Sequence, residues 1–174
     1  KNFLGIPIDG EINAGRKRAA QRPLSELEPL VRAVLGDETI DSFGWIQYTP
    51  YFNDGEPCVF SVGEPWFLTV DDVKPASDDE DEYDYDYEDK YGVLYGDHPS
   101  LGKREYTYVG AYPNRVKQLG DYVGPNSDRY DRCVALADAI SSDAFDDVLL
   151  TAFGDHCRVK VRRDGITVEE YSHD

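Results

Sequence analysis

The sequence predicts an α+β fold in which a mostly antiparallel sheet, built from a meander plus a C-terminal hairpin, packs against about three helices. Strand-like alternation and glycine or proline turns gather in residues 43–109 and 157–169. Helical periodicity is confined to residues 25–36 and 127–154. Because helices and strands are segregated along the chain, a doubly wound parallel sheet is disfavoured.

The length of the chain and the spacing of its cysteines limit the class of protein. The 174 residues are typical of one domain, which we expect over residues 1–174, with an N-terminal arm at 1–22 and an acidic Tyr/Asp-rich loop at 71–91. Three widely spaced cysteines without a CxxC pair disfavour a disulfide framework and a zinc knuckle. No apolar run has the length of a membrane span or a signal peptide, so we expect a cytoplasmic protein without a membrane partner.

Three segments have apolar side chains at helical spacing. In the first, at 25–36, Ser25 and Glu28 have the spacing of a capping box, and Gly36 fits the position after the last turn. Its apolar stripe consists of Leu27, Leu30, Val31, Val34 and Leu35. We expect Ser127 to cap a second helix, and a third to run from Ser142 to Gly154.

The meander is predicted from three strands, at residues 43–52, 58–62 and 66–70. A two-residue loop at Asp54 and Gly55 would place Gln47 opposite Val62. Residues 63–65, Gly-Glu-Pro, are then expected to turn the chain into the third strand.

Further strands are predicted at residues 92–95 and 104–109, followed by a long irregular connection. The chain should close with a hairpin that turns at residues 164–165 and pairs Val161 with Val168. Three cations, Arg158, Lys160 and Arg162, alternate with apolar residues here, which predicts an exposed, partly paired basic face.

Acidic residues dominate the charge of the chain. The formal net charge is −17, and residues 71–91 contribute eleven carboxylates against two lysines, a net of −9. A field of this sign repels nucleic acid and anionic membranes, so we expect no direct nucleic-acid binding. A solvated loop between two strands is the simpler interpretation of the acidic run.

Polar residues at the 47–58 turn form a candidate pocket. They are Gln47, Tyr48, Asn53, Asp54 and Glu56. An enzyme that uses them, with His98 or Cys58, requires that they converge. Because no nucleotide loop, Ser-His-Asp signature or calcium-loop pattern accompanies them, we predict no catalytic residue, metal site or cofactor.

Residues 44–60, Gly-Trp-Ile-Gln-Tyr-Thr-Pro-Tyr-Phe-Asn-Asp-Gly-Glu-Pro-Cys-Val-Phe, resemble a motif of proteins from tailed bacteriophages and some bacteria. The segment from Phe153 to Asp174 resembles the end of the same proteins. The resemblance implies a phage or prophage source and an accessory role in the host cell, and it assigns no activity. The acidic run is an insertion relative to this pattern.

The expected function is therefore that of a small acidic accessory protein that binds a host protein with a basic surface, as a nucleic-acid mimic or inhibitor. Spaced carboxylates resemble phosphates, and the interleaved tyrosines offer contact surface to arginine. The expected contact residues are Asp78, Asp79, Glu80, Asp81, Glu82, Tyr83, Asp84, Tyr85, Asp86, Tyr87, Glu88 and Asp89. The alternatives are the enzyme above and a homo-oligomeric assembly component in which basic residues at 15–22 pair with the acidic run.

Overall fold

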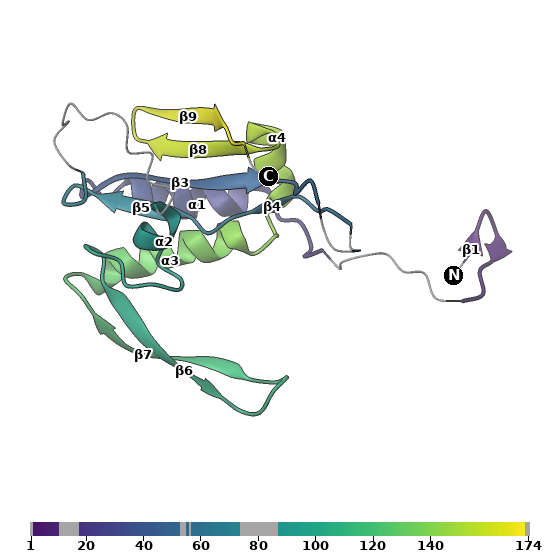
Figure 1. Cartoon of the computed structure of the whole chain (residues 1–174), viewed down its shortest axis with the longest axis horizontal. Helices are drawn as coiled ribbons and strands as arrows, with labels where there is room; N and C mark the ends of the chain where they lie inside the picture. The colour runs from purple at the N-terminus through teal and green to yellow at the C-terminus, as the bar shows by residue number, and fades with distance from the viewer. Residues whose placement is uncertain (1, 11–17, 53–54, 56, 74–86, 173–174) are drawn as a thin grey trace.

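The computed structural model describes residues 2–10, 18–52, 55, 57–73 and 87–172, and it confirms the α+β class. The main sheet has the order β4-β3-β8-β9, with β5 also paired to β3, and all of its pairings are antiparallel (Figure 1). Its strands are β3 (Ile40–Tyr48), β4 (Ser61–Val62), β5 (Trp66–Thr69), β8 (Cys157–Arg162) and β9 (Gly165–Glu170).

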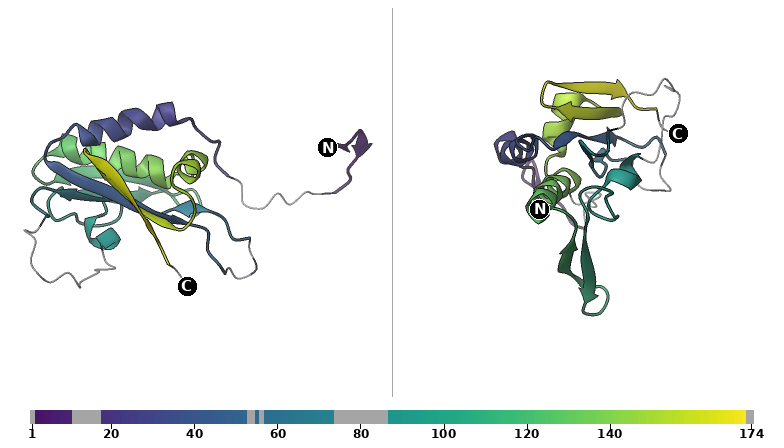
Figure 2. Two further views of the ribbon diagram at one scale, coloured as in Figure 1. Left: turned by 90° about the horizontal axis from the view of Figure 1, so that it is seen from above. Right: turned by 90° about the vertical axis from the view of Figure 1, so that its left-hand side faces the viewer.

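The three predicted helices are present as α1 (Leu24–Leu35), α3 (Ser127–Ser141) and α4 (Asp146–Phe153). Helices α1 and α3 lie side by side on one face of the sheet (Figure 2). A short fourth helix, α2 (Tyr87–Tyr91), occupies the end of the stretch that we expected to be an acidic loop. Tyr91 explains its position, because this side chain is buried with Trp66 and Leu68 on the other face of the sheet.

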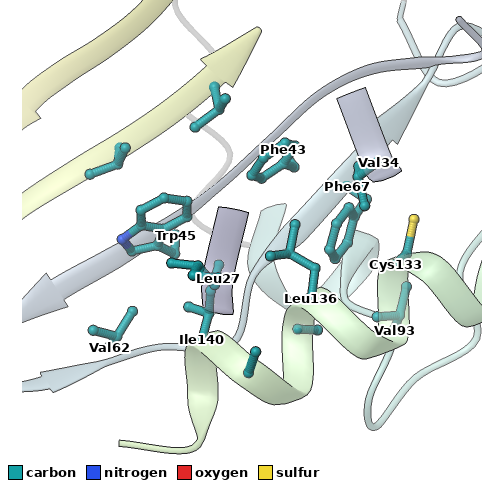
Figure 3. Close-up of a cluster of buried hydrophobic side chains, with 14 of the residues drawn as sticks. Leu27, Val34, Phe43, Trp45, Val62, Phe67, Val93, Cys133, Leu136 and Ile140 are labelled. Carbon is teal, nitrogen blue, oxygen red and sulfur yellow. The ribbon is translucent and has the colours of Figure 1, made fainter. Parts of the chain in front are cut away.

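The core fills the space between the sheet and the helices (Figure 3). Strand β3 sends alternate side chains inward, and the apolar stripes of α1 and α3 face them, as the helical periodicity predicts. The largest labelled core side chains of these elements are Phe43, Trp45, Leu27, Val34, Leu136 and Ile140. Each buried side chain of this size stabilises the fold by about 1.5–3 kcal/mol.

The structure differs from the predicted meander in one strand pairing. Gln47 does lie opposite Val62, as predicted, but β5 pairs with β3 instead of with β4. Strands β4 and β5 therefore follow one another along the same edge of β3, and residues 63–65 interrupt a single run without reversing it. Pro65 has no N–H to donate to the ladder, while the N–H of Gly63 still donates to the Ile46 carbonyl at 2.8 Å.

Helix ends differ from the prediction by a few residues. Helix α1 begins after Pro23, so Ser25 lies inside the helix and caps nothing. Helix α3 is capped by Asn126, not Ser127, because the Asn126 side chain accepts a hydrogen bond from the Arg129 N–H at 3.0 Å. Helix α4 begins at Asp146, four residues after Ser142, and ends at Gly154 as predicted.

The prediction for residues 92–126 is confirmed for the strand at 104–109 and is wrong for the rest. No strand forms at 92–95, and the expected irregular connection contains β7 (Val116–Val123). With β6 (Lys103–Val109), it forms a separate two-stranded antiparallel sheet, which we call the ribbon. The glycine and proline signals between the strands build its turn, where Gly110 adopts a φ of 98° that other residues rarely take.

The terminal hairpin is present with a register two residues from the predicted one. Val159, not Val161, lies opposite Val168, because the turn residues are Arg163 and Asp164 and the pairing closes at Arg162 and Gly165. A shift of two residues leaves every side chain on its predicted face. At the other end of the chain, β1 (Asn2–Phe3) and β2 (Ile6–Pro7) form a small exposed sheet.

Candidate functional site

The predicted acidic contact surface lies mostly outside the described residues. Of that run, Tyr87 and Glu88 begin α2, and Asp89 is exposed on the same helix. Residues 78–86 are among those that the structure does not describe. Whether this run binds a basic partner stays a prediction.

The Gln47 side chain makes hydrogen bonds inside the core. Its side chain is fully buried and accepts a hydrogen bond from Trp45 Nε1 at 2.9 Å. Its Nε2 donates to the backbone carbonyls of Leu149 at 3.1 Å and Gly154 at 2.6 Å. The amide thus links β3 to one carbonyl within α4 and to another just after the end of that helix.

Tyr48 points to the opposite face of β3 and packs against Tyr171, with ring centroids 5.6 Å apart. The two described members of the predicted pocket therefore diverge. Asn53, Asp54 and Glu56 lie outside the described residues, so the enzyme alternative at this turn stays a prediction.

His98 and Cys58, the other side chains considered for an enzyme at this turn, lie in different environments. His98 is buried, and its Nε2 donates to the Phe67 carbonyl at 2.7 Å while its Nδ1 accepts from the Leu101 N–H at 3.0 Å. Burial lowers the pKa of His98, which keeps the ring neutral. Both ring nitrogens are thus engaged in holding the loop before β6. Cys58 is exposed.

Basic residues at 18–22 take partners other than the acidic run. Arg18 Nη2 pairs with Asp147 Oδ1 at 2.7 Å. Arg22 pairs with Glu26 and lies over the Phe145 ring, 5.0 Å from its centroid. These contacts attach the chain that precedes α1 to the start of α4.

The hydrogen bonds and ion pairs that join described residues of the ribbon to the body lie at its base, while farther out Lys117 Nζ lies 6.0 Å from the Tyr95 ring centroid. Tyr122 donates from its hydroxyl to the Leu101 carbonyl at 2.5 Å, and its ring lies 5.2 Å from that of Tyr130 in α3. Arg104 Nη2 pairs with both carboxylate oxygens of Asp131, at 3.0 and 3.3 Å. Beyond this base the ribbon extends away from the main sheet (Figure 1).

The ribbon with its turn, residues 103–123, exposes an unusual amount of apolar surface. Seven of the twenty exposed large apolar side chains in the described ranges belong to its 21 residues, with exposures from 43% to 88%. They are Tyr106, Tyr108, Val109, Tyr112, Val116, Leu119 and Val123. Because neighbouring strand residues such as Tyr108 and Val109 point to opposite faces, both faces of the ribbon carry exposed apolar side chains. Exposed apolar surface gathered on one element is typical of an interaction surface.

A groove of about 620 Å³ separates the ribbon from the body. Tyr106, Lys117 and Leu119 line it on the ribbon side, and Val134 and Asp138 of α3 line it opposite. Burial raises the pKa of Asp138, and the neighbouring Lys117 opposes that effect. The groove thus combines apolar side chains with several charged groups of both signs. They are the carboxylates of Asp97, Glu105, Asp131 and Asp138 and the cations of Lys103, Arg104 and Lys117.

A second hollow, of about 270 Å³, lies on the face of the main sheet that α1 and α3 leave uncovered. We call it the basic recess; its lining residues are Trp66, Arg158, Lys160, Arg162, Thr167 and Glu169. Gly44 lies opposite both Trp66 and Lys160 in the ladders, and a Cβ there would meet the Trp66 ring at 2.4 Å. The missing side chain of Gly44 is therefore what lets the Trp66 ring lie across the sheet.

Comparison with protein-family models, with curated proteins and with solved structures finds no match for this chain. Within the described ranges, no cluster of three or more His, Cys, Asp or Glu side chains could hold a metal ion. The helices of the same part of the chain include none that is long and apolar enough to cross a membrane.

The sequence predicted the strand that becomes β6 but missed β7, because β7 lacks the alternation of a half-buried strand. Its residues are exposed on both faces, with only Tyr122 half-buried. A usable signal was present in the aromatic alternation of Tyr106 and Tyr108 next to the turn residues Gly110 and Pro113.

Proposed function

We propose that this chain is a protein-binding module and that the ribbon is its docking element. The observation that carries the proposal is the exposed apolar surface of a ribbon whose hydrogen bonds to the body, between described residues, lie at its base. These side chains contribute little to the fold, because all seven are exposed and lie outside the core. A hydrophobic surface that does not serve folding is favourable only when a partner covers it.

The ribbon also indicates the chemistry of the partner. Its residues carry four cations and two carboxylates, a net of +2 in a chain of net −17. Arg115 lies 5.3 Å from the Tyr108 ring centroid, and Lys117 lies 4.3 Å from that of Tyr106. Tyrosine and arginine are the residue types enriched at binding hot spots. The matching partner surface has an apolar centre with carboxylates at its rim.

The acidic run gives the chain a second, separate means of binding in this proposal. A net charge of −17 favours association with basic proteins and speeds it at low salt. A phage source and mimicry of nucleic acid remain predictions from the sequence. The two surfaces make different demands, because the ribbon contact should tolerate salt and the acidic contact should weaken in it.

Affinity capture with a matched pair of variants tests the proposal. The ribbon variant is Val116→Ser with Leu119→Ser, at positions that are 65% and 63% exposed. The control is Ile166→Ser with Val168→Ser, at positions of β9 that are 53% and 48% exposed. A partner captured by the intact chain and the control, and lost with the ribbon variant, supports the proposal. A partner that both variants retain contradicts it, as does the absence of any captured partner.

A further inference from the structure

We propose that the basic recess binds a segment of acidic polypeptide in an extended conformation, with its carboxylates on alternate residues. This inference is independent of the ribbon, because the recess lies on the main sheet and shares no lining residue with the groove.

The spacing of the cations carries the first step. Arg158, Lys160 and Arg162 occupy every second position of β8, so their side chains leave the same face of the sheet. Positions two apart in a strand are separated by about 6.6 Å. An extended peptide spaces its alternate side chains in the same way. Carboxylates on alternate residues can therefore meet these cations one to one.

The second step is that the cations are held close together, with Arg158 and Lys160 half-buried and Arg162 exposed. Burial lowers the pKa of Lys160, and the neighbouring Arg162 lowers it further. Asp41 and Glu169 act in the opposite direction, and Glu169 lies opposite Arg158 in the hairpin. No salt bridge between described residues includes Lys160 or Arg162. An incoming carboxylate would relieve the repulsion between the two.

The third step decides between an acidic peptide and a nucleic-acid strand, which also presents regularly spaced anions. Single-stranded nucleic acid is bound through exposed aromatic rings on which its bases stack. The aromatic ring of the recess, Trp66, is only 4% exposed, and Lys160 Nζ lies 5.8 Å from its centroid. The recess thus offers charge without a stacking platform, and it selects carboxylates on a peptide.

The probes are two labelled peptides of equal composition, Glu-Thr-Glu-Thr-Glu and Glu-Glu-Glu-Thr-Thr, with an oligothymidylate of equal charge as the third. Fluorescence anisotropy at low ionic strength measures their binding to the full chain. The alternating peptide should bind most tightly, because all three of its carboxylates match the spacing of β8, whereas only two of the other peptide's carboxylates can lie on one side of an extended chain. Equal binding of the two peptides, tighter binding of the oligothymidylate, or no binding of the alternating peptide would overturn the proposal.

Variants locate the contact. Lys160→Gln with Arg162→Gln should weaken binding of the alternating peptide about tenfold, since each partly exposed ion pair adds a modest amount. Thr167→Glu, which places a carboxylate inside the recess, should weaken it as well. Arg32→Gln with Lys90→Gln removes the same two charges from exposed helical positions and should leave binding unchanged. An equal loss in this control would show that only net charge is sensed, and it would overturn the site.

Discussion

Lys117 Nζ lies 4.3 Å from the centroid of the Tyr106 ring, on the face of the ribbon that lines the groove. Tyr106 is in turn 5.7 Å from Tyr108, which lies directly across the ladder from Lys117. These contacts order exposed side chains that have no core beneath them. Each exposed cation–π contact contributes about 0.5–1 kcal/mol, enough to hold the side chains in place for a partner.

The first prediction is that the apolar residues of the ribbon contribute little to folding. Val116→Ser with Leu119→Ser should change the free energy of unfolding by less than about 1 kcal/mol, because exposed substitutions rarely exceed about 0.5 kcal/mol each. Urea unfolding monitored by tryptophan fluorescence measures it. A loss of several kcal/mol would mean that these side chains serve the fold and would remove the basis of the docking proposal.

The second prediction concerns Gln47. Gln47→Leu should destabilise the protein by about 2–4 kcal/mol, because it leaves Trp45 Nε1 and the carbonyls of Leu149 and Gly154 buried without their partner. Chemical denaturation of the variant gives the value. Gln118→Leu, on the exposed ribbon, is the control and should be nearly neutral. Similar stabilities of the two variants would show that the buried amide is dispensable.

The third prediction concerns Gly44. In Gly44→Ala, the new Cβ would meet the Val159 carbonyl oxygen at 2.2 Å and the Trp66 ring at 2.4 Å. Because one of these atoms is backbone in the neighbouring strand, the sheet must shift, at a cost of about 1–3 kcal/mol or more. Gly165→Ala, where no atom lies within 4 Å of the new Cβ, is the matched control. Equal melting temperatures would contradict the close packing of Trp66 on Gly44.

The fourth prediction is a pH dependence set by His98. Burial lowers its folded-state pKa below the ordinary value of 6.5, although Asp72 opposes this effect. Below pH 6.5 the unfolded chain therefore binds a proton that the folded chain does not, and stability falls as the pH drops from 6.5 towards the folded pKa. The free energy of unfolding should fall less in His98→Asn than in the parent between about pH 7.5 and about pH 5.5. Parallel pH profiles would contradict the neutral buried ring.

Much of the fold could be predicted because its core follows simple periodicities. The stripe of α1, the pairing of Gln47 with Val62 and the end of α4 at Gly154 were all read from local patterns. The pairing of β5 with β3 was missed, because a Gly-Glu-Pro sequence is the same whether the chain reverses or continues along one edge. That choice depends on Phe67, whose burial against Phe43 no local pattern reveals.

The functional surfaces were harder to predict than the core. Strand β7 of the ribbon is exposed on both faces apart from Tyr122, so it carries no hydrophobic alternation, and only β6 could be predicted. The alternating cations of β8 were visible in the sequence, whereas the recess requires Gly44 and Trp66 from two other strands. Gln47 was expected to belong to a pocket, whereas its amide stabilises the fold. Its Nε2 donates to backbone carbonyls that are far away in the sequence.

The most direct measurement of the central proposal is site-specific photo-cross-linking from the ribbon tip. A benzophenone amino acid replaces Tyr112, which is 88% exposed, and in a matched protein it replaces Tyr51, which is 69% exposed on another part of the molecule. We predict a cross-linked protein partner from position 112 and none from position 51; a product with the mass of two chains would identify that partner as a second copy. Cross-linking from position 51 alone, or from neither position, would contradict the ribbon as the docking element.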